Sequence, residues 1–172
     1  MICASSFAVS RLAFTFNGGS HDITAIDPQS DTIVGTVALE GRPEYAVADN
    51  QGHIYVNLVD KSQVVELDSH KLIIKARWSL SPGDGPTGIS MDQTHRRLFI
   101  GCANKLMVVM NADNGKVTSI LPIGSGVDAT AFDPETQLAF SSNGEGTLTV
   151  VHEDSPEKFS VLENVVTQKG SR

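Results

Sequence analysis

Short apolar runs of four to eight residues, separated by turns rich in Gly, Asp, Asn and Pro, follow one another along the chain. The runs are enriched in β-branched and aromatic residues, and the 3.6-residue spacing of an amphipathic helix is nearly absent. An aromatic-centred run returns about every 41 to 44 residues, at 12–16, 54–56, 98–100 and 138–140. The pattern therefore predicts an all-β protein built from repeats.

Each aromatic-centred run is followed by a similar series of β-type runs. The second runs lie at 23–26, 64–67, 106–110 and 148–151, and the third runs at 32–39, 72–80, 116–123 and 159–166. A fourth run follows a Gly-rich connection, at 45–49, 88–92 and 129–133. Four short antiparallel strands in a unit of this size are typical of a β-propeller blade. We expect one propeller domain over residues 1–172, with blades at about 4–40, 44–81, 87–123 and 128–166.

Two segments carry a family resemblance. Residues 54–57 with 64–68, and residues 140–143 with 146–151, resemble the repeat of YVTN-family β-propellers. Residues 99–102 depart from the tetrad that names the family. The resemblance implies a larger propeller, commonly seven-bladed, and a periplasmic or otherwise extracytoplasmic location.

The number of blades depends on the two ends of the chain. A strand at 6–9 would complete four blades, about the number needed for the smallest closed propeller. Gly170, however, lies one repeat beyond Gly126, at the connection that leads into a further inner strand. We therefore expect a partial propeller rather than a closed one. Open blade edges would favour self-association or a missing partner segment.

Charge and hydropathy exclude several classes of protein. The chain has 13 basic and 20 acidic residues, a net charge of −7, and its few basic residues are scattered. Such a chain repels a phosphate backbone, so we expect no nucleic-acid partner. No apolar run approaches the roughly 20 residues of a membrane-spanning helix. Residues 1–16 lack the basic and apolar regions of a signal peptide.

The chain has two cysteines, Cys3 and Cys102. They form no CxxC pair and no neighbouring His suggests a zinc site. We interpret them as buried or incidental thiols, while a disulfide between them stays open.

Candidate binding residues lie in the connections into the inner strands and in the turns between the second and third strands. In a propeller these loops project from the same face, where ligand sites are common. On that face we place Arg42, Glu44, Asp128 and Asn143, at the mouth of the expected channel. Arg42 would anchor an anion, and Glu44 with Asp128 would ligate a metal or act as an acid/base pair. The alternative is that these are solvated loop charges.

Other polar motifs have a structural interpretation. Asp49, Asp92 and Asp133 each follow an inner strand, where a carboxylate bonds backbone amides of the turn. The match of residues 83–88 to GxGxxG precedes a strand rather than a helix, so it predicts no nucleotide site. Five scattered histidines predict no metal cluster. No catalytic residue and no cofactor are expected, because no nucleophile elbow, Cys/His pair or HExxH motif is present.

These observations favour a non-catalytic propeller scaffold that presents loops of one face to a protein, peptide or small ligand. The alternative is a lactonase-like or quinoprotein-like propeller enzyme, with a metal or quinone over the central channel. A third possibility is a structural fragment without activity of its own.

Overall fold

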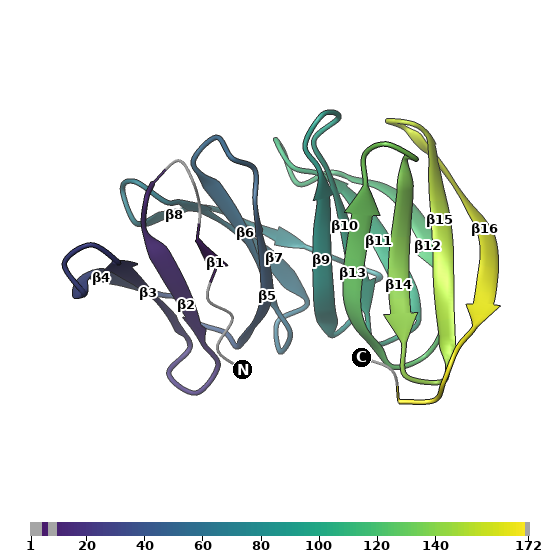
Figure 1. Ribbon diagram of the computed structural model, residues 1–172, viewed down its shortest axis with the longest axis horizontal. Coiled ribbons are helices and arrows are strands. Elements are labelled where there is room, and N and C mark those ends of the chain that lie inside the picture. The colour runs from purple at the N-terminus through teal and green to yellow at the C-terminus, as the bar shows by residue number, and fades with distance from the viewer. Residues whose placement is uncertain (1–4, 7–9, 171–172) are drawn as a thin grey trace. The chain divides into compact units, whose positions relative to one another are not determined.

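The computed structural model describes residues 5–6 and 10–170. The described residues form strands and turns, without a helix, in four antiparallel four-stranded sheets (Figure 1). The all-β prediction is therefore confirmed. Within these residues no helix is long and apolar enough to span a membrane.

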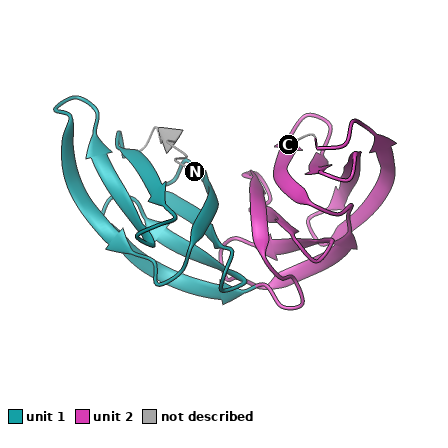
Figure 2. Cartoon of the chain, turned by 90° about the horizontal axis from the view of Figure 1, so that it is seen from below, with its two compact units in different colours: residues 1–79 teal, residues 80–172 magenta. Residues whose placement is uncertain are grey.

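The chain divides into two compact units, residues 1–79 and 80–172, shown in different colours in Figure 2. Each unit contains two sheets, and in each sheet the strands lie in chain order. The sheets of unit 1 consist of β1 (Ser5–Ser6), β2 (Ala13–Asn17), β3 (Asp22–Asp27) and β4 (Thr32–Ala38), and of β5 (Pro43–Ala48), β6 (His53–Leu58), β7 (Gln63–Asp68) and β8 (Ile73–Ser79). The predicted strand at 6–9 overlaps β1 at Ser6, and residues 7–9 lie outside the described residues.

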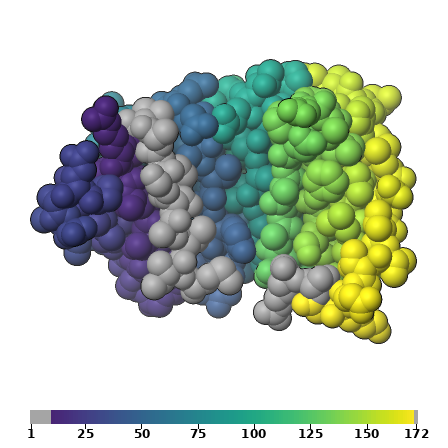
Figure 3. Space-filling model, viewed as in Figure 1, coloured from purple at the N-terminus to yellow at the C-terminus, as the bar shows by residue number. Residues whose placement is uncertain are grey.

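The sheets of unit 2 repeat the same up-and-down order. They consist of β9 (Pro86–Asp92), β10 (Arg97–Cys102), β11 (Leu106–Asn111) and β12 (Val117–Pro122), and of β13 (Val127–Asp133), β14 (Leu138–Asn143), β15 (Thr147–Ser155) and β16 (Lys158–Val166). The outer strand β16 lies along the margin of this unit, in yellow in Figure 3. Its residues Leu162, Val165 and Val166 are 58 %, 39 % and 84 % exposed, so this edge offers apolar surface to solvent.

Two of the repeated aromatic residues, Phe14 and Phe99, lie in the cores of the two units. In unit 1, Phe14 and Phe16 pack in a cluster of buried residues with Ile54 and Val56. In unit 2, Phe99 is fully buried, lies stacked on Phe132 with ring centroids 5.1 Å apart, and meets Phe159 edge-on at 5.8 Å. Because successive side chains of a strand point to opposite faces, one residue of each aromatic-centred run is directed between the sheets of a unit.

Close packing of the inner strands of unit 2 depends on Gly88, the last glycine of the GxGxxG match. Gly88 lies in β9, so the match indeed falls on a strand. A Cβ atom at this position would come within 2.6 Å of the backbone nitrogen of Thr130 in β13. The glycine is therefore explained by the approach of two strands, not by a phosphate.

The turns confirm the structural role of the repeated aspartates. Asp49 accepts hydrogen bonds from the backbone amides of Gln51 and His53, at 2.8 and 2.9 Å. Asp133 accepts from the amide of Glu135 at 3.1 Å and from the Thr136 hydroxyl at 2.7 Å. These side chains satisfy turn amides that the sheet ladders leave free.

Candidate functional site

A hollow of about 400 Å³ opens at one end of unit 1, lined by Gly18, Gly19, Arg42, Pro43 and Glu44. The β2–β3 turn supplies the two glycines, and the connection between β4 and β5 supplies the other three residues. A Cβ atom at Gly19 would have no atom within 4 Å, so the glycine side of the hollow is open.

The backbone of Arg42 is held from two sides. Its amide donates to Asp60 Oδ1 at 2.7 Å, and its carbonyl accepts from the Val59 amide at 3.0 Å. The hydrogen bond from the Arg42 amide is the main cause that lowers the pKa of Asp60, which therefore stays ionised at neutral pH. The turn between β6 and β7 thus positions Arg42.

The side chain of Arg42 is available for binding. It is 53 % exposed, and its Nη2 lies 3.7 Å from Glu44 Oε2. At this distance the pair attract each other without a strong hydrogen bond, so a ligand anion can compete for the guanidinium. Two of the four predicted binding residues are therefore together at one hollow.

The other two predicted binding residues lie in unit 2. Asp128 is half-buried on β13. Asn143, at the end of β14, is fully buried: its Oδ1 accepts from the Ser141 hydroxyl at 2.9 Å, and its Nδ2 donates to the hydroxyl oxygens of Thr147 and Thr149 at 3.1 and 3.0 Å. Asn143 thus holds the β14–β15 turn, and a ligand contact at Asp128 or Asn143 stays a prediction.

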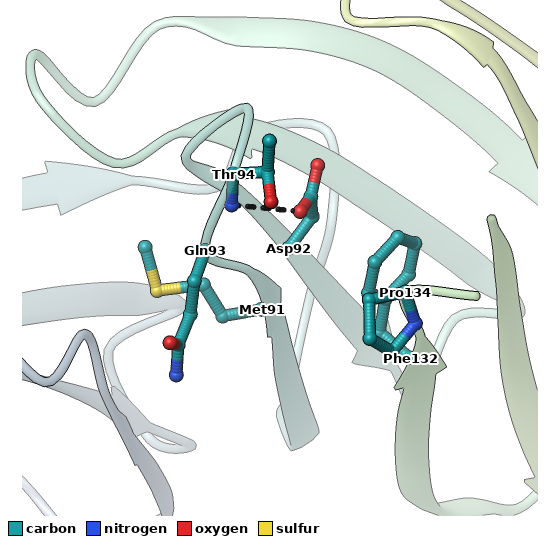
Figure 4. A pocket seen from close by; sticks show the side chains of 6 residues that line it. All are labelled: Met91, Asp92, Gln93, Thr94, Phe132 and Pro134. Carbon is teal, nitrogen blue, oxygen red and sulfur yellow. Dashed lines mark hydrogen bonds between the residues drawn. The ribbon is translucent and has the colours of Figure 1, made fainter.

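A second group of polar side chains lies at the other end of the sheets of unit 2. Asp92, at the end of β9, accepts from the backbone amide of Thr94 at 2.9 Å (Figure 4). It also accepts from the backbone amide of His95 at 3.1 Å. This is the turn interaction predicted for the repeated aspartates. The same side chain has a further contact, because His95 Nδ1 lies 2.7 Å from Asp92 Oδ2.

Glu153, from β15 of the neighbouring sheet, reaches the same histidine. Its Oε1 lies 3.0 Å from His95 Nδ1. The glutamate is only 4 % exposed, and neither of its carboxylate oxygens has a partner in hydrogen-bond geometry within the described structure. Burial is the main cause that raises its pKa to about 7, and the charge of Asp92 raises it further, while His95 and Arg97 oppose the shift. We refer to Asp92, His95 and Glu153 as the acidic–histidine cluster.

Arg97 closes one side of this cluster. The guanidinium donates to the backbone oxygens of Pro156 and His95, both at 2.7 Å, and to Glu157 Oε1 at 2.6 Å. It thereby ties the β9–β10 turn to the β15–β16 turn. Its charge partly balances the two carboxylates, but its hydrogen bonds are directed to other groups.

A hollow of about 390 Å³ adjoins the cluster on the side of Asp92. It is lined by Met91, Asp92, Gln93, Thr94, Phe132 and Pro134. Figure 4 shows the Asp92 carboxylate between Thr94 on one side and Phe132 with Pro134 on the other. Only 1 % of Asp92 is exposed, so the side chain of His95, which is 35 % exposed, is the part of the cluster nearest to solvent.

The cluster was not among the predicted sites. The sequence marked Asp92 as a turn residue and predicted no metal cluster among the five histidines. Nothing in it linked Asp92 or His95 to Glu153, which lies on a different repeat. Residues this far apart carry no ligand spacing, so no motif signals the meeting of the three side chains.

Comparisons with known proteins show the fold. No protein-family model and no curated protein matches the chain. Among solved structures, the chain is similar to a putative 6-phosphogluconolactonase from Bacteroides uniformis, with a TM-score of 0.81 and 11 % identity over 97 % of this chain and 55 % of that one. It is also similar to Kuenenia stuttgartiensis hydrazine synthase, with a TM-score of 0.77 and 18 % identity over 93 % of this chain and 47 % of that one.

A third similar structure is the dihydro-heme d1 dehydrogenase NirN in complex with DHE, with a TM-score of 0.69 and 15 % identity over 89 % of this chain and 35 % of that one. The chain thus spans about half or less of the length of these propeller-type proteins. At these identities the likeness shows the β-propeller fold, as predicted, and not an activity.

Proposed function

We propose that this chain is a non-catalytic propeller module that binds a carboxylate-bearing peptide or small molecule at the hollow of unit 1. The observation that carries the proposal is the half-exposed guanidinium of Arg42 at the rim of that hollow, on a backbone held by Asp60 and Val59. A guanidinium binds a carboxylate through two parallel hydrogen bonds, and a pre-positioned backbone reduces the entropy lost on binding.

Glu44 gives the same site a second specificity. Its carboxylate is 24 % exposed and lies beside the guanidinium, so it can accept a hydrogen bond from a donor next to the ligand's anionic group. A peptide C-terminus, with a carboxylate next to an amide N–H, offers both groups. A ligand that has a carboxylate but no neighbouring N–H donor would bind Arg42 and leave Glu44 without a hydrogen bond from the ligand.

The proposal includes the view that the chain is one part of a larger propeller. The resemblance to YVTN-type repeats and the partial match in length support a module of a larger, extracytoplasmic propeller. The exposed apolar residues of β16 support self-association or contact with a further blade at this edge.

We expect Arg42→Gln to weaken the binding of a carboxylate ligand by about 10- to 100-fold, the loss of one charge-assisted hydrogen-bonded pair. The measurement is calorimetry of the full chain with a panel of N-acetylated dipeptides that carry a free C-terminal carboxylate. Their C-terminal amides should bind wild type and variant equally weakly. Lys71→Gln is the matched control, because it removes a side-chain charge that is 73 % exposed at the opposite end of unit 1. Equal carboxylate binding by wild type and Arg42→Gln would contradict the proposal.

The enzyme alternative rests on the similarity to the putative 6-phosphogluconolactonase. Under this alternative Arg42 would anchor a phosphate, and Glu44 beside it would move a proton. We would then expect the purified full chain to hydrolyse 6-phosphogluconolactone above the spontaneous rate, and Glu44→Gln to remove that activity. Hydrolysis at the spontaneous rate, with and without added divalent ions, would leave the binding module as the better explanation.

A further inference from the structure

We propose that the acidic–histidine cluster of unit 2, formed by Asp92, His95 and Glu153, binds a divalent transition-metal ion, with Zn²⁺ preferred. This site is separate from the proposed ligand site in unit 1, and neither proposal depends on the other.

The first observation is the convergence of three ligand atoms. One atom each of Asp92, His95 and Glu153 lies within 4.8 Å of the other two. His95 Nδ1 is between the carboxylates, 2.7 Å from Asp92 Oδ2 and 3.0 Å from Glu153 Oε1. Zinc bonds of about 2.0–2.2 Å need ligand atoms slightly further apart than this. A small rotation of the carboxylates is enough to provide that space.

The second observation is independent of the first and concerns the state of Glu153. Both of its carboxylate oxygens are buried and have no hydrogen-bond partner among residues 5–6 and 10–170, and the side chain is directed at His95. An ionised carboxylate in this state carries a large desolvation cost, which a bound cation removes. The buried carboxylate is therefore the feature that points to a ligand.

Unit 1 contains an instructive contrast. Glu66, also largely buried, lies 2.7 Å from His53 Nδ1 and 3.0 Å from Lys75 Nζ. There the chain itself supplies the cation that neutralises the glutamate–histidine pair. In unit 2, by contrast, the guanidinium of Arg97 directs its hydrogen bonds to Pro156, His95 and Glu157 rather than to Glu153.

The surroundings hold the three ligands in place. The amides of Thr94 and His95 orient the Asp92 carboxylate, and Arg97 fixes the His95 backbone through its carbonyl. The amide of Glu153 donates to the carbonyl of Gln137 at 2.9 Å. Such supporting contacts reduce the reorganisation needed for metal binding.

The donor set favours zinc over calcium or magnesium. Calcium and magnesium bind oxygen ligands, whereas an imidazole nitrogen with two carboxylates suits Zn²⁺. Three protein ligands leave a fourth position for water, and the partly exposed side chain of His95 places the cluster next to solvent. Because the imidazole must be deprotonated at the ligating nitrogen, binding should weaken as the pH falls.

The test is a titration of the metal-free full chain with Zn²⁺, in competition with a chromophoric chelator, together with the thermal midpoint. We expect one equivalent to bind at the cluster and raise the midpoint, and both Glu153→Gln and His95→Gln to weaken this binding at least about tenfold. Glu153→Gln keeps the shape of a buried residue, and His95 is half-exposed, so at least one variant should fold. Circular dichroism checks the fold of each.

His53→Gln is the matched control, because it removes the histidine of the pair in unit 1 and should leave Zn²⁺ binding unchanged. Three outcomes would overturn the proposal. They are the absence of a Zn²⁺ equivalent in wild type, wild-type affinity in both cluster variants, and tighter binding of Ca²⁺ or Mg²⁺ than of Zn²⁺.

Discussion

Replacing Phe99 by Ala is expected to lower the free energy of unfolding by about 3–5 kcal/mol, the largest effect of a single substitution that we anticipate in this chain. Phe99 is fully buried, stacked on Phe132 and edge-on to Phe159. Removal of the ring leaves a cavity between the two sheets of unit 2 and takes away both aromatic contacts. Through these two rings Phe99 links β10 to β13 and β16.

Urea unfolding followed by far-ultraviolet circular dichroism measures the effect. The single Trp of the chain, Trp78, lies in unit 1, so its fluorescence follows that unit and is a poor reporter of unit 2. Phe140 provides the matched control, since it holds the same repeat position in the next sheet but is only half-buried. Phe140→Ala should cost clearly less than Phe99→Ala. Equal losses of unfolding free energy in the two variants would mean that the position in the repeat, and not the burial of the ring, determines how much a residue stabilises the fold.

The repeat predicted much of this fold because each of its signals is local. Strands were expected around Phe14, Tyr55, Phe99 and Phe140, and all four residues lie in strands. The turn role of Asp49, Asp92 and Asp133 was equally predictable, because an Asx turn is formed by residues two or three positions apart. Alternation and turn chemistry are properties of short segments, so a single sequence displays them.

The candidate sites were less predictable because they depend on contacts between segments that are far apart in the sequence. Arg42 and Glu44 could be found together because they are two residues apart, on either side of Pro43. The sequence could not show that Glu153 lies next to Asp92 and His95, because this contact results from the packing of β15 beside the β9–β10 turn. For Asn143 the sequence showed the place at a turn, but it did not show the hydrogen bonds to Ser141, Thr147 and Thr149, so a ligand contact there stays a prediction.

Replacing Glu153 by Gln should stabilise the metal-free protein, and the gain should depend on pH. The pKa of Glu153 is raised from its ordinary value of 4.5 to about 7 in the folded chain. Between these values the folded state holds a proton that the unfolded state has lost, so raising the pH lowers the stability of the wild type. Above about pH 7 the full cost of the ionised, buried carboxylate is present. Glutamine does not ionise in this pH range, so the stability of the variant does not fall in this way as the pH rises.

We therefore expect the variant to be more stable than wild type by about 2 kcal/mol at about pH 8.5, a value below the full shift because the half-exposed His95 lets solvent screen the cluster. Near pH 4.5 the difference should be small, since Glu153 is then protonated in the folded state. Urea unfolding in the presence of a chelator measures both values. Glu163→Gln, which neutralises an exposed glutamate of β16, is the control and should show little dependence on pH. A variant less stable than wild type at the higher pH would mean that the Glu153 carboxylate is already paired in the metal-free chain, and it would remove the main physical reason for a cation at this cluster.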